Sequence, residues 1–361
     1  MKPDTYAARI DRLRGGMKDS GLGALLVVGA KNVRYLSGFS GEDAVVLVLP
    51  DEGLLLTDSR FRLQAQEESV HLRIVEPAEK LSQAVPGLVA GVEGAVGLEA
   101  EHLTLAQWQA FQQEAPRDDF YHPVEGLVSK LRRVKDAEEI ELMRASGALA
   151  TAVMEYLAGI RVVGRTEVEV ALDLEVWLRR RGSEGLPFPF IVAHGEHGAR
   201  PHAVPRNEVI AAGRLLVVDL GAVVQGYASD ITRTFATGPL SERELEMYEV
   251  VKEAQAIGRA GIRPGMSGME ADRLVRDVVE SGGMGSLFEH SLGHGVGLDV
   301  HEAPRLGPKS EDLLEVGNVV TVEPGVYDPG LGGVRIEDTV VLGDNGATVL
   351  TETTRELAFL H

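Results

Sequence analysis

The sequence predicts an α+β protein with two domains, a smaller α/β domain at residues 1–126 and a larger α+β domain at residues 127–361. Three observations lead to this prediction. The chain has 361 residues, which is more than a single hydrophobic core usually supports. In its N-terminal third, short apolar runs alternate with helical stretches, as in α/β domains. In the remainder, pairs of apolar strands joined by Gly-rich or Pro-rich turns stand between long helices.

The N-terminal domain is expected to begin with an amphipathic helix at residues 4–20. Four short apolar runs follow, which we interpret as strands: ALLVVGA, VRYLSGF, AVVLVLP and GLLLTDSRF. The stretch SRFRLQAQEES is typical of a helix. The charged sequence LVSKLRRVKDAEE, at residues 127–139, predicts a helix with a solvated face, and we place the domain junction just before it.

The C-terminal domain is expected to contain four long helices, which the pattern places at residues 137–160, 166–182, 241–262 and 268–281. Antiparallel strand pairs lie between and after them. Helices beside antiparallel hairpins predict an α+β domain in which the helices cover one face of a curved sheet.

The composition excludes several classes of protein and site. A net charge of −19 argues against nucleic acid or an anionic membrane as a partner, because most of the surface would repel phosphate groups. The absence of cysteine excludes disulfides, thiolate ligands and a cysteine nucleophile. The N-terminal sequence MKPDTYAARIDRL has no apolar core of a signal peptide, and no apolar run approaches the roughly 20 residues that span a bilayer. We therefore expect a cytoplasmic protein.

Two aspartates stand on a predicted hairpin. Asp219 ends the run RLLVVDLGA, Asp230 lies in YASDITRTF, and the intervening VVQG is typical of a tight turn with Gly226 at positive φ. If the turn is centred between residues 224 and 225, the two aspartates lie directly opposite. If it is centred between residues 225 and 226, Asp219 opposes Thr232 and Asp230 is its diagonal neighbour. Both registers place the carboxylates on one face, because side chains alternate with a period of two and the registers differ by two.

A second hairpin repeats this arrangement. Glu323 follows the strand-like NVVTV, Glu337 lies in GVRIEDTVVL, and the intervening PGVYDPGLGG must reverse the chain. His294, in HSLGHGVGLDVHE, offers a nitrogen ligand. Taken singly, an Asp at a strand end is usually a turn residue, and a single His is more often a hydrogen-bonded core residue. Four carboxylates and one imidazole in apolar segments cannot be buried together unless cations neutralise them, so the conjunction predicts a two-metal hydrolase.

Other catalytic motifs receive no support. The string HEAPR at His301 is not the HExxH of helix-borne zinc proteases, and no GxSxG nucleophile elbow is present.

Five segments, in chain order, resemble the signatures of the proline-specific M24 metallopeptidases, namely aminopeptidase P and prolidase (Xaa-Pro dipeptidase): VVDLGA, GYASDITRTF, HSLGHGVGLDVHE, TVEPGVY and GVRIEDTVVL. The likeness extends over nearly the whole chain, since the N-terminal part is similar to the creatinase-like domain of the short prokaryotic members. The resemblance implies the pita-bread fold for residues 127–361, with the metals on the concave face of its sheet.

The resemblance also implies how the ligands are shared between two cations. Asp230 and Glu337 would bridge the ions, Asp219 would complete one of them, and His294 with Glu323 would complete the other. Coordination rich in oxygen with one imidazole favours Mn²⁺, and Co²⁺ or Zn²⁺ is compatible with it.

Further residues receive catalytic roles by the same resemblance. His202 matches a position that contacts the substrate near the scissile bond, and His301 matches one that stabilises the tetrahedral intermediate or the leaving imino nitrogen. His290 is a candidate for supporting a ligand or transferring a proton. Glu323 is the preferred general base, because a metal-bound carboxylate can accept a proton from water. Arg335 shares a strand face with Glu337, so we expect a charge-assisted bond to a nearby carboxylate.

The predicted function is that of a dinuclear metal-dependent exopeptidase that cleaves the Xaa-Pro bond at the N-terminus of peptides, of the aminopeptidase P type. The alternative is a prolidase restricted to dipeptides, for which a cationic side chain of the N-terminal domain, Arg34, Arg60 or Arg62, would capture the substrate carboxylate. Less favoured alternatives are a methionine aminopeptidase-like enzyme and a non-catalytic pita-bread binding module. The expected partners are a peptide with proline at its second position and, from the resemblance, a second copy in a homodimer.

The substrate pocket receives four aromatic candidates. An apolar pocket for the proline ring and a proton donor for its nitrogen are needed, and the segment FPFIVAHGEHGARPHAVP offers Phe188 and Phe190 beside His202. Tyr227 and Tyr327 are further candidates to line the pocket, although aromatic packing explains them equally well.

Overall fold

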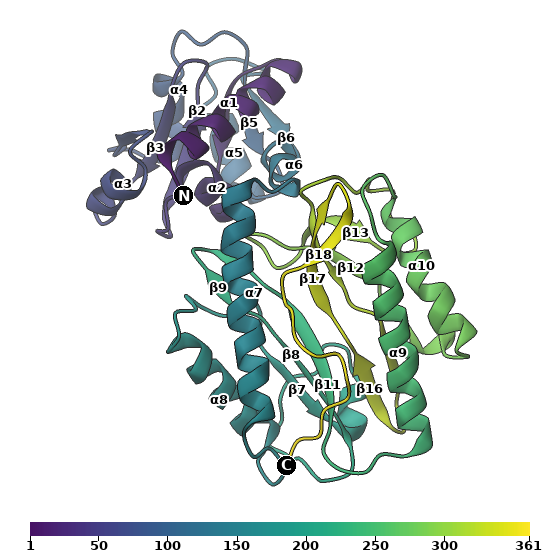
Figure 1. The fold of residues 1–361 in the computed structure, drawn as a ribbon. Helices are drawn as coiled ribbons and strands as arrows, with labels where there is room; N and C mark the ends of the chain where they lie inside the picture. Colours follow the sequence, from purple (N-terminus) through teal and green to yellow (C-terminus); the bar gives the residue numbers. More distant parts are fainter. The chain divides into compact units, whose positions relative to one another are not determined.

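The computed structural model describes residues 1–361, which form two compact units, Met1–Arg132 and Arg133–His361 (Figure 1). The sequence places the junction just before residue 127, whereas helix α6 (Leu127–Arg133) stays with the first unit up to Arg132. The reason is a pair of long-range hydrogen bonds. Tyr35 Oη donates to the Leu131 carbonyl over 3.3 Å, and Arg132 Nη1 donates to Asn32 Oδ1 over 2.8 Å.

The first unit is an α/β domain built on one six-stranded sheet with the order β4-β3-β2-β1-β5-β6. Strands β2 and β3 form an antiparallel hairpin and β2 is also antiparallel to β1, while the pairs β1–β5, β3–β4 and β5–β6 are parallel. Its strands are β1 (Leu22–Val27), β2 (Ala44–Val48), β3 (Gly53–Thr57), β4 (Arg73–Val75), β5 (Ala95–Glu99) and β6 (Tyr121–Val124). Its other helices are α1 (Pro3–Asp19), α2 (Ala30–Ser37), α3 (Arg62–Glu68), α4 (Leu81–Leu88) and α5 (Leu105–Gln113).

The prediction of a strand at VRYLSGF is wrong, because its first five residues belong to helix α2, which Gly38 caps at the C-terminus. The carboxylate of Glu99, at the end of β5, accepts hydrogen bonds from the backbone N–H groups of Val28 and Gly29 and from Asn32 Nδ2. An anionic group at a helix N-terminus satisfies donors that the helix itself cannot pair. The residue that stabilises the start of α2 thus lies about seventy positions away in the sequence.

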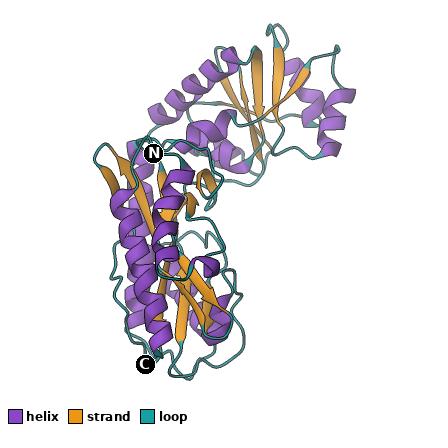
Figure 2. Ribbon diagram, turned by 90° about the vertical axis from the view of Figure 1, so that its right-hand side faces the viewer, coloured by secondary structure: helices purple, strands orange, loops and turns teal.

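The second unit is an α+β domain, and its four long helices match the predicted ones. They are α7 (Ala137–Ala158), α8 (Glu167–Arg179), α9 (Glu242–Gly261) and α10 (Gly268–Ser281), and each begins with a capping box that satisfies its first N–H groups. Two short 3₁₀ helices, η1 (Gly195–Ala199) and η2 (Gly285–Leu287), complete the helical elements. Figure 2 shows the long helices gathered on one side of the strands, as the sequence predicts.

The strands of the second unit form two main sheets, with the orders β11-β8-β7 and β13-β12-β14-β17-β18, and two short hairpins, β9–β10 and β15–β16. The strands of the first sheet and its hairpin are β7 (Ile191–His194), β8 (Leu215–Leu220), β9 (Val223–Val224), β10 (Tyr227–Ala228) and β11 (Ile231–Ala236). The others are β12 (Gly293–Gly295), β13 (Glu302–Leu306), β14 (Val319–Val322), β15 (Gly325–Asp328), β16 (Gly332–Arg335), β17 (Asp338–Gly343) and β18 (Gly346–Val349).

Two hydrophobic cores divide the second unit into similar halves. In one, α7 and α8 pack on the sheet of β7, β8 and β11, with Val153, Leu174 and Val218 fully buried. In the other, α9 and α10 pack on the strands from β14 to β17, with Val275 and Val340 fully buried. Each half is thus a helix pair on an antiparallel sheet, and side chains on the uncovered faces of both are available to a common site. No helix of the chain is both long and apolar enough to cross a bilayer.

A buried ion network fastens strand β17 to the rest of the unit. The carboxylate of Asp338 is fully buried and accepts hydrogen bonds from Arg233 Nη2 over 2.8 Å, Arg355 Nε over 2.6 Å and Gln255 Nε2 over 2.5 Å. Burial raises the pKa of Asp338, but the two arginines outweigh this and lower it below its ordinary value. The carboxylate therefore stays charged and links β11, β17, α9 and the C-terminal segment.

Removal of this carboxylate should destabilise the fold. Asp338→Ala leaves the buried Arg233 guanidinium without its counter-charge, so we expect a loss of about 3–5 kcal/mol in the free energy of unfolding, measured by urea denaturation. Glu352→Ala removes an exposed partner of the same Arg355 and serves as the control, with an expected change of about 0.5 kcal/mol or less. Equal losses in the two variants would contradict the role of the network.

Candidate metal centre

The first hairpin adopts the second of the two predicted registers. Strand β8 pairs with β11 so that Asp219 lies opposite Thr232, and Val224 pairs with Tyr227 across the turn. Gln225 and Gly226, the two turn residues, have φ values of 47° and 84°, which is the left-handed backbone of a type I′ turn. Asp230 just precedes β11 and is the diagonal neighbour of Asp219. The two carboxylates therefore lie on the same face.

The second hairpin brings its two glutamates directly opposite each other. Val322 pairs with Asp338 in the β14–β17 ladder, and Gly325 pairs with Arg335 in the β15–β16 ladder. Both pairs belong to one continuous register, so Glu323 and Glu337 face each other where the strands pass from one ladder to the next.

His294 comes from the middle of the short strand β12, which pairs with β14. Its backbone N–H donates to Thr321 Oγ1 over 3.0 Å, and its ring Nδ1 donates to the Gly295 carbonyl over 3.1 Å. The ring therefore presents Nε2 to the carboxylates, with Glu323 Oε1 at 3.2 Å and Asp230 Oδ2 at 3.7 Å. A histidine that donates one ring N–H to a carbonyl and turns the other nitrogen inward is the usual arrangement of a metal ligand.

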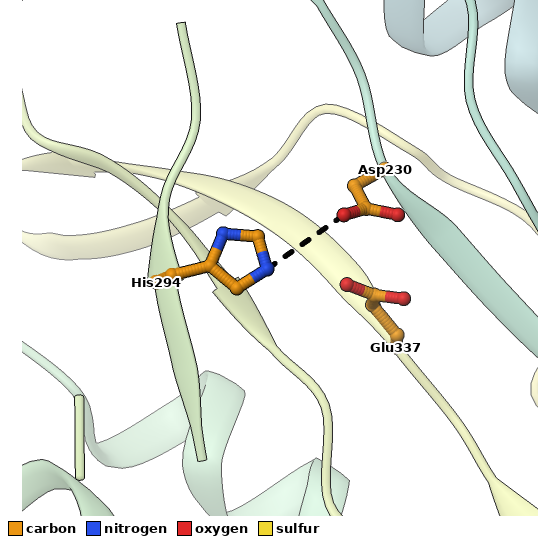
Figure 3. A group of neighbouring side chains, drawn as sticks. All are labelled: Asp230, His294 and Glu337. Atoms are coloured by element: carbon orange, nitrogen blue, oxygen red, sulfur yellow. Dashed lines mark ion pairs between the residues drawn. The ribbon is translucent and has the colours of Figure 1, made fainter. Parts of the chain in front are cut away.

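The hairpins and β12 together make a cluster of possible metal ligands. One ligand atom from each of Asp230, His294 and Glu337 lies within 4.8 Å of the others (Figure 3). Glu323 adjoins this group through His294. Asp219 lies close enough for its charge to raise the pKa of both Asp230 and Glu337. All five predicted ligands thus lie in one region of the second unit.

The electrostatics of the cluster are unfavourable without additional positive charge. Burial, and after it the neighbouring carboxylates, raise the pKa of Asp230 and of Glu337 well above their ordinary values. Burial also raises the pKa of Asp219, although Arg335 opposes it. At Glu323 the hydrogen bond and charge of His294 outweigh burial and lower the pKa to about 2.

Three carboxylate oxygens of the cluster have no partner within the protein. Asp219 Oδ1, Asp230 Oδ1 and Glu337 Oε1 are buried and accept no hydrogen bond, while the other oxygen of Asp219 and of Glu337 is well paired. Unpaired buried carboxylate oxygens carry a large desolvation cost. These atoms, together with His294 Nε2, therefore fit a divalent cation as the missing partner.

Arg335 contacts the cluster directly, and the expected charge-assisted bond is present. Its Nη2 donates to Asp219 Oδ2 over 2.6 Å and its Nε donates to Thr232 Oγ1 over 3.0 Å. Thr232 Oγ1 in turn donates to Glu337 Oε2 over 2.6 Å. Arg335 thus orients one carboxylate directly and a second one through a hydroxyl group.

The three remaining histidines of the prediction lie around the cluster. The ring of His301 lies 4.3 Å from that of His294, centroid to centroid. His290 Nδ1 donates to the Ser291 carbonyl, so its Nε2 accepts from Tyr327 Oη over 2.9 Å. His202 is exposed, and it is close enough for its charge to lower the pKa of both His290 and His301. Burial is the largest cause of the lowered pKa at these two residues.

Two of the aromatic pocket candidates lie elsewhere. Phe190 belongs to the core beneath α7 and α8, because it precedes β7 on the face that turns towards the helices. Tyr227 is buried and its Oη donates to Glu139 Oε1 over 3.0 Å. Tyr327, by contrast, is near the cluster, where its Oη accepts from Arg335 Nη1 over 2.8 Å, and burial raises its pKa to about 12. Phe188 is half-buried in the loop before β7.

Two of the arginines suggested for substrate capture already bind carboxylates of their own domain. Arg60 is paired with Asp58 and Asp43, and Arg62 is paired with Glu76, all on the exposed surface of the first unit. Arg34 lies in the last turn of α2.

The sequence did not reveal the residues that hold the ligands in place. Thr232 and Thr321 donate to Glu337 and Glu323, and Glu167 binds the loop that carries His202. A threonine two residues from a predicted ligand on the same strand shares its face, and this spacing was the available signal for Thr321 and Thr232. Glu167 is distant in the sequence and gave no such signal.

Two parts of this chain match known protein families. Residues 141–344 match metallopeptidase family M24, and residues 9–134 match the creatinase/prolidase N-terminal domain. An Xaa-Pro dipeptidase of Pyrococcus furiosus is 34% identical over 97% of this chain and 99% of its own length.

Two solved structures are similar over nearly the whole chain. The Xaa-Pro dipeptidase from Bacillus anthracis has a TM-score of 0.94 at 38% identity and covers 98% of this chain and 100% of its own. The X-Pro aminopeptidase from Thermotoga maritima has a TM-score of 0.89 at 32% identity, with the same coverage of 98% and 100%.

A divalent cation should stabilise the chelator-treated protein, and more so at higher pH. Because the pKa values of Asp230 and Glu337 are raised, the metal-free folded state keeps protons that the unfolded state loses, and its stability falls as the pH rises above the ordinary carboxyl range. A cation replaces these protons, so its effect grows with pH and reaches about 2.7 kcal/mol at roughly one hundred times its Kd. Thermal unfolding at about pH 5 and about pH 8, with and without Mn²⁺, measures this difference.

Substitutions identify the site of this stabilisation. Asp230→Asn and Glu337→Gln should abolish the Mn²⁺-dependent shift in Tm, while Glu356→Gln, at an exposed position in the second unit, should retain it. A shift that survives both cluster substitutions would place the cation elsewhere.

Proposed function

Because this chain belongs to metallopeptidase family M24, we propose that it hydrolyses the bond between the first residue and a following proline in peptides, with dipeptides as its preferred substrates. The observation that carries the proposal is the convergence of Asp230, His294 and Glu337, from separate strands, on one buried position. Unpaired oxygens at this position fit the divalent cations that a metallopeptidase needs.

We propose two divalent cations, with Mn²⁺ as the native metal. Asp219, Asp230, His294, Glu323 and Glu337 would hold these cations. When bound, such a pair of cations polarises the scissile carbonyl and lowers the pKa of a water molecule towards neutrality. The donor set of oxygens with one imidazole supports Mn²⁺, because carboxylate-rich sites suit this ion.

The side chains around the cluster supply the remaining chemistry. Glu323 Oε1 is held by Thr321 Oγ1 over 3.0 Å and by His294, so this carboxylate is oriented to accept a proton from the attacking water. His202 and His301 lie on the exposed side, where the peptide would enter, and each offers an N–H to the carbonyl oxygen or to the leaving nitrogen. The Tyr327 hydroxyl donates to His290 Nε2 and accepts from Arg335 Nη1. His290 is thus our candidate for a proton-transfer group that acts through this hydroxyl.

Proline as the target follows from the chemistry of its nitrogen. An Xaa-Pro bond has no N–H, so peptidases that need this donor cleave it poorly. The leaving group is a secondary amine that must receive a proton, and we propose the exposed imidazole of His202 as the donor.

The choice between dipeptides and longer peptides rests on the relatives. The Pyrococcus furiosus and Bacillus anthracis proteins are both named Xaa-Pro dipeptidase, which supports the prolidase alternative. The Thermotoga maritima protein, with a TM-score of 0.89, is named an X-Pro aminopeptidase, so the aminopeptidase activity stays the second candidate. The homodimer and the cytoplasmic location stay predictions.

Substrate length separates the two activities. The Mn²⁺-loaded enzyme should hydrolyse Gly-Pro with a kcat/KM about tenfold or more above that for a tripeptide that extends beyond the proline. Gly-Gly is the control for proline specificity and should be cleaved poorly. A tripeptide that is hydrolysed as well as or better than the dipeptide would favour the aminopeptidase activity, and loss of the preference for proline would reject both.

His202 should contribute to turnover and not to metal binding. His202→Ala removes a proton donor outside the ligand set, so we expect kcat for Gly-Pro to fall about 10²-fold or more while the bound metal content stays unchanged. His122→Ala, at an exposed histidine of the first unit, is the matched control and should leave both quantities unaltered. Loss of metal in His202→Ala would instead assign His202 to the ligands.

A further inference from the structure

A buried glutamate outside the metal centre holds the loop that carries His202. Glu167 is the first residue of α8, and its carboxylate is fully buried. Oε1 accepts from the backbone N–H of His194 over 3.0 Å and from its ring Nδ1 over 2.9 Å. Oε2 accepts from His197 Nδ1 over 2.9 Å and from the backbone N–H of Arg206 over 2.8 Å. All four donors belong to residues 194–206, which we call the His202 loop.

These bonds keep the carboxylate charged in spite of its burial. Burial raises the pKa of Glu167, but the hydrogen bonds from His194, Arg206 and His197 outweigh it and lower the pKa to about 2. A buried carboxylate with both oxygens saturated is strongly held in one orientation. The same group therefore fixes both ends of the His202 loop to the start of α8.

Backbone bonds reinforce the contact at the C-terminal end of the loop. The N–H of Val168 donates to the Arg206 carbonyl and the N–H of Glu167 donates to the Glu208 carbonyl, each over 3.2 Å. These are first-turn donors of α8 that the helix itself cannot pair. The loop thus ends against the helix N-terminus through main-chain and side-chain bonds together.

Between its two ends, the loop contacts β16 and Arg335. A Cβ atom at Gly333 would lie 2.0 Å from the Gly198 carbonyl oxygen, so the loop backbone rests against β16. The Pro201 carbonyl, next to His202, accepts from Arg335 Nη1 over 3.2 Å. Arg335 also binds Asp219, so the residue beside His202 is tied to a predicted metal ligand through one guanidinium group.

The side chain of His202 itself is exposed and receives no hydrogen bond that would orient it from the core. Its position therefore depends on the backbone of the loop. That backbone is held at three places: at residues 194–197 by Glu167, at Pro201 by Arg335, and at Arg206 again by Glu167.

We propose that Glu167 is a positioning residue for hydrolysis, which acts by holding the His202 loop so that the His202 imidazole faces the metal centre. This inference rests on the proposed function, in which His202 contacts the substrate. The hydrogen bonds of the Glu167 carboxylate go to His194, His197 and Arg206 and to none of the predicted ligands, so we expect it to act through the loop.

A double-mutant cycle with His202 distinguishes positioning from general stabilisation. Glu167→Gln keeps the shape of the side chain but turns an amide NH₂ towards N–H donors, so kcat/KM for Gly-Pro should fall about 10- to 100-fold with unchanged Mn²⁺ content. In the His202→Ala background the same substitution should cost about twofold or less, because the group through which it acts is missing. Equal fold losses in both backgrounds would overturn the proposal.

Glu169→Gln is the matched control. Glu169 lies on the same turn of α8 and is exposed. Its carboxylate accepts from the Thr166 backbone N–H, and its own backbone N–H donates to Thr166 Oγ1. We expect this variant to stay within about twofold of wild type in both backgrounds.

Hydrogen exchange tests the positioning role without any activity. The amides of Arg200 and Ala203 donate within the loop, to the carbonyls of His197 and Arg200. In Glu167→Gln, exchange at residues 195–205 should become faster while the strands β8 and β14 keep their protection. Unchanged exchange in the loop would overturn the proposal. If the wild-type enzyme fails to cleave Gly-Pro, the proposed function is wrong, and this measurement still decides whether Glu167 holds the loop.

A second variant covers the case in which Glu167→Gln does not fold. His197→Phe keeps a ring in the buried position and removes one of the four donors. It should speed exchange at residues 195–205 to a smaller degree and lower kcat/KM less than Glu167→Gln. Wild-type exchange in this variant would contradict the role of the Glu167 bonds.

Discussion

The second unit is organised around the repulsion among four buried carboxylates. Asp219, Asp230, Glu323 and Glu337 approach one another in a mostly buried region, where Arg335 and His294 are the cationic side chains in direct contact with them. Such an arrangement is costly until a further positive charge enters. The raised pKa values and the unpaired oxygens of the cluster are two expressions of this single constraint.

Four of the buried carboxylates of this protein form two contrasting pairs. Glu167 and Asp338 have every oxygen paired with N–H donors, and their pKa values are lowered although burial alone would raise them. Asp230 and Glu337 keep unpaired oxygens, and their pKa values are raised. The first kind fastens strands and loops in place, whereas the second kind keeps its lone pairs available to a metal ion. Hydrogen-bond saturation, and not burial, separates Glu167 and Asp338 from Asp230 and Glu337.

The match to metallopeptidase family M24 confirms the resemblance that the sequence motifs indicated, and with it the two-domain fold. Much of the second unit was predictable because its signals are local. Four capping boxes mark the starts of the long helices, and the two-residue parity of strands places Asp219 and Asp230 on one face in either register. The positive φ values of Gln225 and Gly226 then select one register.

The sequence by itself determined the residue types of the metal centre, the face on which each hairpin presents them and the limits of the long helices, because these depend on neighbours within a few positions. Only the tertiary structure decided what lies across long separations. Glu99 binds the N-terminus of the helix that includes most of VRYLSGF. Phe190 packs in the core beneath α7 and α8, and Glu167 binds the His202 loop. The bonds of Glu99 and Glu167 join residues about seventy and about forty positions apart, and hydrophobic periodicity carries no information about such partners.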